Sequence, residues 1–208
     1  MGLGFFIRIM RNGNNVSSKN MVNNVLILVS GLPATGKTTI AKRISEEFNI
    51  PFASADAIKE TMWDTLGHDF DFEFNDKIGH TAFELLFYFI EASLSKGKAL
   101  VVEAHFNPER NNLRINELKK RFASKLVQVY CDCETETLQK RFKERAGADS
   151  YHAGHKHTIN LYGEERILNS LGNKNKKLEL DSATYELDTT NPEKIDYEKL
   201  FGFIRSNI

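Results

Sequence analysis

The feature that most constrains this chain is the stretch GLPATGKTT at residues 31–39. It matches the pattern Gly-x-x-x-x-Gly-Lys-[Ser/Thr], which is typical of a loop whose backbone amides wrap the phosphates of a nucleotide. Such a loop joins a buried strand to a helix, and the flanking residues fit both. Residues 25–29 form an apolar run rich in β-branched side chains, and Ile40, Ile44 and Phe48 recur every fourth residue. The sequence therefore predicts a site for a nucleoside triphosphate.

The residue types within the loop indicate how the nucleotide would be held. Gly31 and Gly36 allow a tight turn and a close approach of the backbone amides. Lys37 is expected near the β- and γ-phosphates, and Thr38 is expected to bind the Mg²⁺ that bridges them. The following helix adds partial positive charge at its N-terminus. The loop residues expected to contact ATP are Gly31, Pro33, Ala34, Thr35, Gly36, Lys37, Thr38 and Thr39.

Beyond this loop, apolar strands alternate with helical patterns along the whole chain. The expected strands are residues 25–29, 51–55, 98–104, 125–131 and 183–188. Strictly alternating strands and helices imply a parallel sheet covered on both faces. The predicted fold is therefore α/β: a three-layer P-loop NTPase fold with a mainly parallel five-stranded sheet, helices on both faces and a mobile lid.

Local signals predict where individual elements begin. The alternation of acids and phenylalanines over residues 69–74 predicts an extended segment, followed by a long helix over residues 75–95. Asn107 as N-cap and Pro108 as first helical residue predict another helix start. The same signal recurs at residues 191–193, ahead of the closing helix.

The same patterns suggest how the chain divides. Residues 1–24, rich in Asn and Ser, are expected to be a flexible N-terminal extension, and residues 25–208 a single nucleotide-binding domain. A lid is expected at about residues 141–158, with a mobile stretch at 147–158 and a helix near 160–171.

Composition adds limits on the class of protein and its location. The 208 residues suit one domain, and 28 Lys and Arg balance 28 Asp and Glu, so no global basic field favours nucleic acid. The only cysteines, Cys131 and Cys133, lie too close together for an ordinary disulfide framework, which favours a reducing compartment. No apolar run approaches the roughly 20 residues that a membrane span needs, and the N-terminus is a poor signal peptide. The expected location is the cytoplasm.

Two acidic residues follow predicted strands. Because ligands gather at the carboxyl ends of parallel strands, Asp56, Glu103 and the lid after Cys131 are expected at the same edge as residues 31–39. Asp56 either orients an attacking hydroxyl or merely caps the helix that follows it. Glu103 either orients a Mg²⁺-bound water or the substrate, or it is a surface carboxylate.

The order of these parts resembles a known family. Residues 54–59 read SADAIK, matching Ser-x-Asp-x-[Ile/Tyr]-[Arg/Lys]; Arg141 and Arg145 lie four residues apart; and residues 188–190 read DTT. Over about residues 25–205 the chain resembles the small P-loop kinases known as AAA-domain predicted kinases. Polynucleotide 5′-hydroxyl kinase, zeta toxin and chloramphenicol phosphotransferase are similar in plan.

The resemblance implies roles for the matching residues. Asp56 would accept the proton of the attacking hydroxyl or orient it, and Lys59 would touch the substrate. Arg141 and Arg145 on the lid helix would neutralise charge on the transferring phosphoryl group, unless they form a solvated helix flank. Thr190 would lie near the adenine.

Other residues are less well defined by the resemblance. The third strand of relatives usually ends in Asp, where this chain has Glu103. Arg110 is a candidate substrate ligand, although arginines on such helices are mostly solvated. The lid also contains three histidines for which no cysteine or carboxylate stands at metal-ligand spacing. They are expected to belong to a polar lid rather than to a metal site: His152, His155 and His157.

The combined expectation is an ATP-dependent kinase that transfers the γ-phosphoryl group to a hydroxyl of a small molecule, with Mg²⁺ as cofactor. Two alternatives remain open: a polynucleotide 5′-hydroxyl kinase, and a nucleotide-binding regulatory module without an acceptor. Nucleic acid is therefore a possible but not favoured partner, no membrane contact is expected, and the protein would be a monomer or a homodimer.

Overall fold

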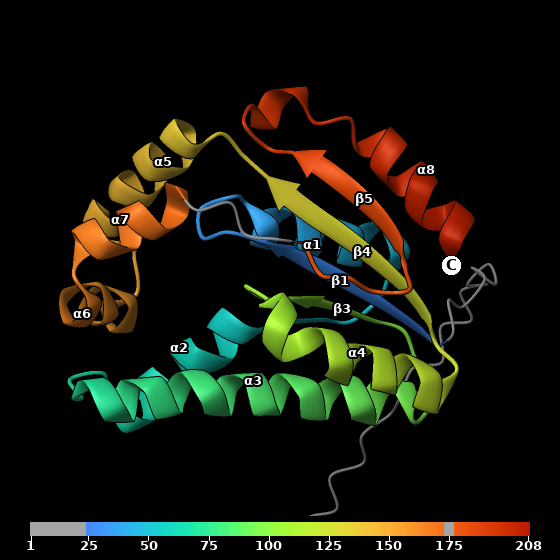
Figure 1. Ribbon diagram of the computed structural model, residues 1–208, viewed down its shortest axis with the longest axis horizontal. Helices are drawn as coiled ribbons and strands as arrows, with labels where there is room; N and C mark the ends of the chain where they lie inside the picture. Colours follow the sequence, from blue (N-terminus) through green and yellow to red (C-terminus); the bar gives the residue numbers. More distant parts are fainter. Residues whose placement is uncertain (1–23, 173–176) are drawn as a thin grey trace, which may run out of the picture.

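Within the part of the chain that the structure describes, the central sheet has the predicted number of strands, and all of them run parallel. The computed structural model describes residues 24–172 and 177–208. The strand order is β2-β3-β1-β4-β5, with β1 in the middle (Figure 1). The bounds are β1 Val25–Gly31, β2 Phe52–Ser54, β3 Leu100–Glu103, β4 Lys125–Asp132 and β5 Ala183–Asp188. The predicted five-stranded parallel sheet is confirmed.

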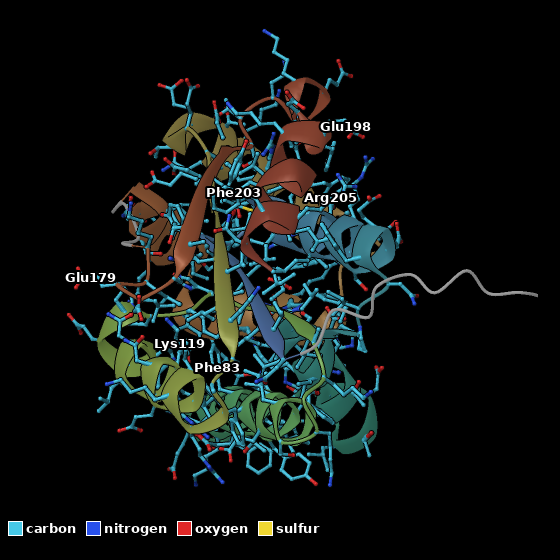
Figure 2. The ribbon with its side chains drawn as sticks, turned by 90° about the vertical axis from the view of Figure 1, so that its right-hand side faces the viewer. Phe83, Lys119, Glu179, Glu198, Phe203 and Arg205 are labelled. Atoms are coloured by element: carbon cyan, nitrogen blue, oxygen red, sulfur yellow. The ribbon has the colours of Figure 1, made fainter. Side chains whose placement is uncertain are left out.

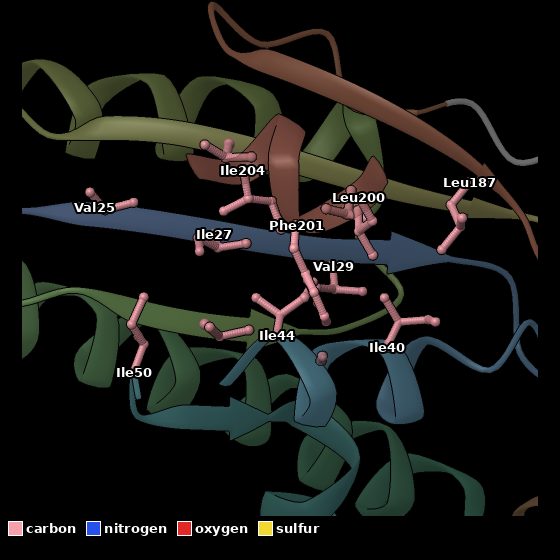
Figure 3. Packing of buried hydrophobic residues seen from close by; sticks show 14 of the residues in the cluster. Val25, Ile27, Val29, Ile40, Ile44, Ile50, Leu187, Leu200, Phe201 and Ile204 are labelled. Carbon is pink, nitrogen blue, oxygen red and sulfur yellow. The ribbon is translucent and has the colours of Figure 1, made fainter. Parts of the chain in front are cut away.

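Helices cover both faces of this sheet because successive side chains of a strand point to opposite faces. Val25, Ile27 and Val29 of β1 pack with residues of α1 and α8 (Figure 3). Leu26 and Leu28 pack on the other face with residues of α3 and α4. Figure 2 shows α8 and α4 on opposite sides of the strands. The helices on the two faces are α1 Lys37–Phe48, α8 Tyr197–Asn207, α3 Phe72–Leu94 and α4 Pro108–Phe122.

Among the described residues, four further helices lie beyond the carboxyl ends of the strands or beside α3. Helix α2, Ala55–Leu66, follows β2 and packs along α3. Helices α5 Thr135–Gly147, α6 Ala153–Tyr162 and α7 Glu164–Gly172 form the helical unit at the left of Figure 1. A small separate core joins this unit to the loop after β1; its buried members are Leu32, Cys133, Leu138, Phe142 and Leu171.

The prediction of an extended segment over residues 69–74 is wrong for residues 72–74. Helix α3 already begins at Phe72, and the Asp71 carboxylate caps it by accepting a hydrogen bond from the Phe74 amide at 2.8 Å. Phe70 and Phe74, four residues apart, bring their ring centroids to 4.2 Å. The alternating residues therefore belong to the start of a helix, and the acid Asp71 is its N-cap.

Two other helix starts differ from the prediction. Asp56 does not cap α2: the N-cap is Ser54, whose hydroxyl accepts from the Ala57 amide at 3.4 Å, and Asp56 lies in the first turn. Asn191 caps only a short 3-10 helix, Pro192–Lys194, and α8 starts later with Asp196 as its cap. Asn107 and Pro108 open α4 as predicted.

The stretch 147–158 is more regular than predicted. Helix α6 starts at Ala153 and continues to Tyr162, and Gly163 separates it from α7. The single helix predicted near residues 160–171 is therefore two helices. Of the predicted N-terminal extension, residues 1–23 lie outside the described residues. Within the described ranges, no helix combines the length and the apolar character that a membrane span requires.

The corrected start of α3 gives a first prediction. Asp71→Ala removes the capping carboxylate and should lower the free energy of unfolding by about 1 kcal/mol, whereas Asp71→Asn should keep most of the cap. Urea denaturation followed by circular dichroism measures both. Equal stabilities of the two variants would contradict the helix start at Phe72.

Candidate active site

The loop after β1 has a backbone shape that restricts its residue types. Gly31 has a φ of +145°, and a Cβ there would lie 2.3 Å from the carbonyl oxygen of Cys131, so no larger residue fits. Gly36 has a φ of +83° at the N-terminus of α1. The buried Thr35 hydroxyl donates to the Leu32 carbonyl at 2.9 Å, which closes the loop upon itself. The predicted strand–loop–helix unit is present.

Lys37 and Glu103 form the charged centre of this edge. The Lys37 ammonium donates to the Leu32 carbonyl at 3.1 Å and lies 3.7 Å from Glu103 Oε1. Glu103 is only 2% exposed, so it is not the surface carboxylate that the sequence allowed. A buried carboxylate is costly unless it is paired and hydrogen-bonded. Glu103 meets both conditions.

Two hydroxyl groups complete the surroundings of Glu103. Ser54 donates to Glu103 Oε2 at 2.8 Å, and Thr38 donates to the same oxygen at 3.2 Å. The sheet register explains this meeting, because Ser54 and Glu103 are direct partners in neighbouring strands. Ser54 is a residue of the site that the sequence reasoning missed. Its only signal was its place in the SADAIK segment, which drew attention to Asp56 instead.

Asp56 and Lys59 project from the first turns of α2. The Lys59 ammonium lies 3.3 Å from Asp56 Oδ1. Burial alone would raise the pKa of Asp56, but the charges of Lys59, His155 and Lys37 outweigh it, so the pKa lies below its usual value. Asp56 is therefore an ionised hydrogen-bond acceptor at the same edge as the loop after β1.

His105 is a second residue that the sequence reasoning missed. Desolvation by the surrounding protein, with Lys37 and Lys59, lowers its pKa to about 4, against an opposing effect of Asp56. His105 is nevertheless exposed to solvent at this edge. The imidazole is neutral at pH 7 and can both donate and accept hydrogen bonds. The sequence signal that could have found His105 is its position two residues after Glu103, at the carboxyl end of β3.

The two lid arginines contact different parts of the molecule, although they lie four residues apart on α5. Arg141 donates to the carbonyl oxygens of Thr189 at 3.0 Å and Thr190 at 2.9 Å, so it is not a solvated flank. The guanidinium carbon of Arg145 lies 5.0 Å from the ring centroid of Tyr151. Arg141 thus contacts the loop after β5, and Arg145 the segment between α5 and α6.

A cavity of about 200 Å³ lies between the loop after β1, Arg141 and the segment that leads into α8. Its lining residues include Arg141 and Tyr197, whose side chains carry flat groups of a kind that suits a planar base. Thr190, expected near the adenine, lines a neighbouring cavity of about 430 Å³ that also borders Leu32 and Asp188. The Thr190 hydroxyl accepts from the Glu134 amide at 3.1 Å.

The remaining candidates lie apart from this centre. Arg110 is exposed on the first turn of α4 and forms no ion pair with any described residue. The three lid histidines each contact α2 or the segment before α3. Among residues 24–172 and 177–208, no three or more His, Cys, Asp or Glu side chains are grouped as a metal site would need.

Fold and loop together define a P-loop kinase-like architecture. Residues 26–163 match the family model described as an AAA domain, and the chain belongs to this family. A protein of Chloroflexus aurantiacus J-10-fl, provisionally described as a kinase, shares 28% identity over 88% of this chain and 98% of its own, with a TM-score of 0.80. No curated protein matches.

More distant solved structures share the fold alone. A sugar kinase of Janibacter sp. HTCC2649 has 18% identity and a TM-score of 0.57, over 88% of this chain and 95% of its own. A gluconokinase of Sinorhizobium meliloti 1021 has 15% identity and a TM-score of 0.51, over 90% of this chain and 95% of its own. These likenesses support the three-layer fold.

The pKa of His105 gives a second prediction. In the unfolded chain an ordinary histidine takes up its proton near pH 6.5, whereas folded His105 does so only near pH 4. Its contribution to stability is therefore complete above pH 6.5 and is lost as the pH falls toward 4. His105→Gln should flatten this part of the curve of unfolding free energy against pH. Parallel curves for the variant and the native protein would contradict the lowered pKa.

Proposed function

We propose that this protein is an ATP-dependent kinase that transfers the γ-phosphoryl group to a hydroxyl of a small-molecule acceptor. The observation that carries the proposal is the closeness of two charged groups at one sheet edge. Lys37, where the loop after β1 enters α1, lies 3.7 Å from Glu103 Oε1, and Glu103 accepts a hydrogen bond from Ser54, two residues before Asp56. In keeping with this, the charge of Lys37 contributes to the lowered pKa of Asp56 on α2. A donor phosphate bound at this loop would thus lie at the same sheet edge as a group able to orient an acceptor hydroxyl.

The donor side would use the loop and the cavity beside it. The amides of residues 33–39 would surround the phosphates of ATP, and the Lys37 ammonium would turn toward the β- and γ-phosphates. The base would enter the cavity of about 200 Å³ and lie against the Arg141 guanidinium. These groups position the donor, which is the main requirement of phosphoryl transfer.

The residues present fit Mg²⁺. This ion takes oxygen ligands, usually one or two from protein in addition to phosphates and waters. Thr38 and Glu103 offer such oxygens within 3.2 Å of each other, beside the phosphate-binding loop. When bound there, Mg²⁺ would neutralise charge on the donor phosphates. Thr38 would be the direct ligand, and Glu103 would hold the Thr38 hydroxyl or a bound water.

The acceptor side would use Asp56. Its carboxylate would accept a hydrogen bond from the acceptor hydroxyl and align the oxygen with the γ-phosphorus. A bond then forms between that oxygen and the phosphorus, the bond to the bridging oxygen breaks, and ADP leaves. Because the pKa of Asp56 is lowered, the hydroxyl proton would pass onward to solvent rather than stay on the carboxylate. Arg145 would approach the transferring group from the lid.

Features away from the site support the finer parts of the proposal. Helices α5, α6 and α7 lie beyond the carboxyl ends of the strands (Figure 1), an arrangement that favours a small acceptor over a polymer. Equal numbers of acidic and basic residues, 28 each, give no general attraction for a polynucleotide. Cys131 and Cys133 are both free and buried, in keeping with a reducing compartment such as the cytoplasm.

Lys37→Ala tests the donor side. Loss of the ammonium should reduce transfer from γ-labelled ATP by about 10²-fold or more, because the phosphates lose a positioned charge. The assay offers a fractionated metabolite pool and 5′-hydroxyl oligonucleotides, and mass spectrometry identifies the product. Lys42→Ala, an exposed lysine of α1, is the matched control. Normal turnover by Lys37→Ala would overturn the assignment.

Asp56→Asn tests the acceptor side. ATP affinity, measured by titration calorimetry, should be unchanged, while transfer should fall by roughly 10²-fold because the acceptor hydroxyl is no longer oriented by a charge. Asp76→Asn, at an exposed position of α3, serves as control. If Asp56→Asn transfers phosphate at the native rate, Asp56 has no part in the reaction. Labelling of oligonucleotides instead of metabolites would favour a polynucleotide kinase.

A further inference from the structure

The lid is attached to α2 by side chains that the proposed reaction places in direct contact with neither donor nor acceptor. His152 and His155 of the lid contact two carboxylates of α2 on either side of Trp63. His152 Nε2 lies 3.1 Å from Asp64 Oδ1, and His155 Nε2 lies 3.0 Å from Glu60 Oε1. We call these five residues the histidine latch.

The hydrogen bonds of His152 show how this contact is oriented. Its Nδ1 accepts from the Gly154 amide at 3.0 Å and so caps α6. A nitrogen that accepts carries no hydrogen, so in the neutral ring the hydrogen is on Nε2 and is donated to Asp64. One imidazole therefore both starts α6 and ties it to α2.

Trp63 is the packing centre of the latch. It is 1% exposed, and its ring lies 5.6 Å from that of His152 and 4.9 Å from that of His155, centroid to centroid. Gly154 fits against its face so closely that a Cβ there would lie 2.3 Å from Trp63 Cδ2. The absence of a side chain at Gly154 lets α6 lie directly on α2.

Helix α2 presents the latch and the acceptor side together. Asp56, Lys59, Glu60 and Trp63 recur at three- and four-residue spacing, so they share one side of the helix. From the latch, a chain of contacts leads to the lid arginine. The His155 ring stacks on Tyr151 at 5.1 Å with an interplanar angle of 8°, and Arg145 lies over the same tyrosine at 5.0 Å.

We propose that His155 is a positioning residue for phosphoryl transfer: by binding Glu60 and stacking on Tyr151, it holds Arg145 over the acceptor carried by α2. The inference rests on the proposed function. According to this inference, the position of Arg145 is set by α2, the helix that would bind the acceptor, and not by the loop after β1. In this proposal His155 acts through Tyr151 and Arg145 and not by binding a substrate.

The activity test is a double-mutant cycle. His155→Ala should lower kcat by roughly 10-fold to 10²-fold with ATP affinity unchanged, since a small displacement of a catalytic group costs this much. His155→Gln keeps a donor for Glu60 and should recover much of the rate. In an Arg145→Ala background, His155→Ala should cost almost nothing more. His80→Ala, an exposed histidine that pairs with Asp76 on α3, is the matched control.

A second readout does not depend on activity. Trp63 is the only tryptophan of the chain, so its fluorescence reports on the latch alone. His155→Ala and Gly154→Ala should both shift its emission to longer wavelength, because α6 no longer shields the indole; His80→Ala should not. Melting temperatures verify that the variants are folded.

The outcomes separate the two proposals. If the native protein phosphorylates no acceptor, the proposed function fails, while the fluorescence of the variants still decides whether the latch holds α6. If the native protein is active and His155→Ala matches it in rate, the positioning role is overturned. Additive losses in the double-mutant cycle would equally overturn it, because His155 would then act independently of Arg145.

Discussion

The site depends on one buried carboxylate. Glu103 ends the strand next to β1, and the side chains of Lys37, Thr38 and Ser54 all lie around it. Removing a carboxylate from water costs several kcal/mol unless charge and hydrogen bonds compensate. Here one ammonium and two hydroxyls supply that compensation. Lys37 and Thr38 come from the start of α1, and Ser54 from the end of β2. The carboxylate therefore brings the start of α1, the end of β2 and the end of β3 to a common point.

The strand-loop-helix unit could be predicted from the sequence because its signals are local. An apolar run, two glycines at fixed spacing and a four-residue apolar repeat each describe neighbouring residues, and the parallel sheet follows from their alternation along the chain. Gly31 shows the physical reason. Its conformation and its contact with the Cys131 carbonyl leave no room for a side chain. The glycine in the sequence pattern therefore indicates the backbone geometry of the loop directly.

The rest of the site depends on contacts between distant residues, which local patterns do not report. Ser54 meets Glu103 only because β2 and β3 pair in one register, and nothing around Ser54 in the chain indicates this. His155 and Glu60 are 95 residues apart. The start of α3 was missed for another reason. Asp71 is its N-cap, and within a few residues of sequence a capping acid cannot be told from an acid of an alternating strand pattern.

The attachments of the lid have a mechanical consequence for the whole sheet. Arg141 binds the loop that follows β5, at one edge of the sheet, and the latch binds α2, which follows β2 at the other edge. The helices from α5 to α6 therefore form a strap that crosses all five strands at their carboxyl ends. A sheet joined in this way resists spreading at the end where chemistry is proposed. Release of the contacts at one end would leave the other end as the point about which these helices could turn.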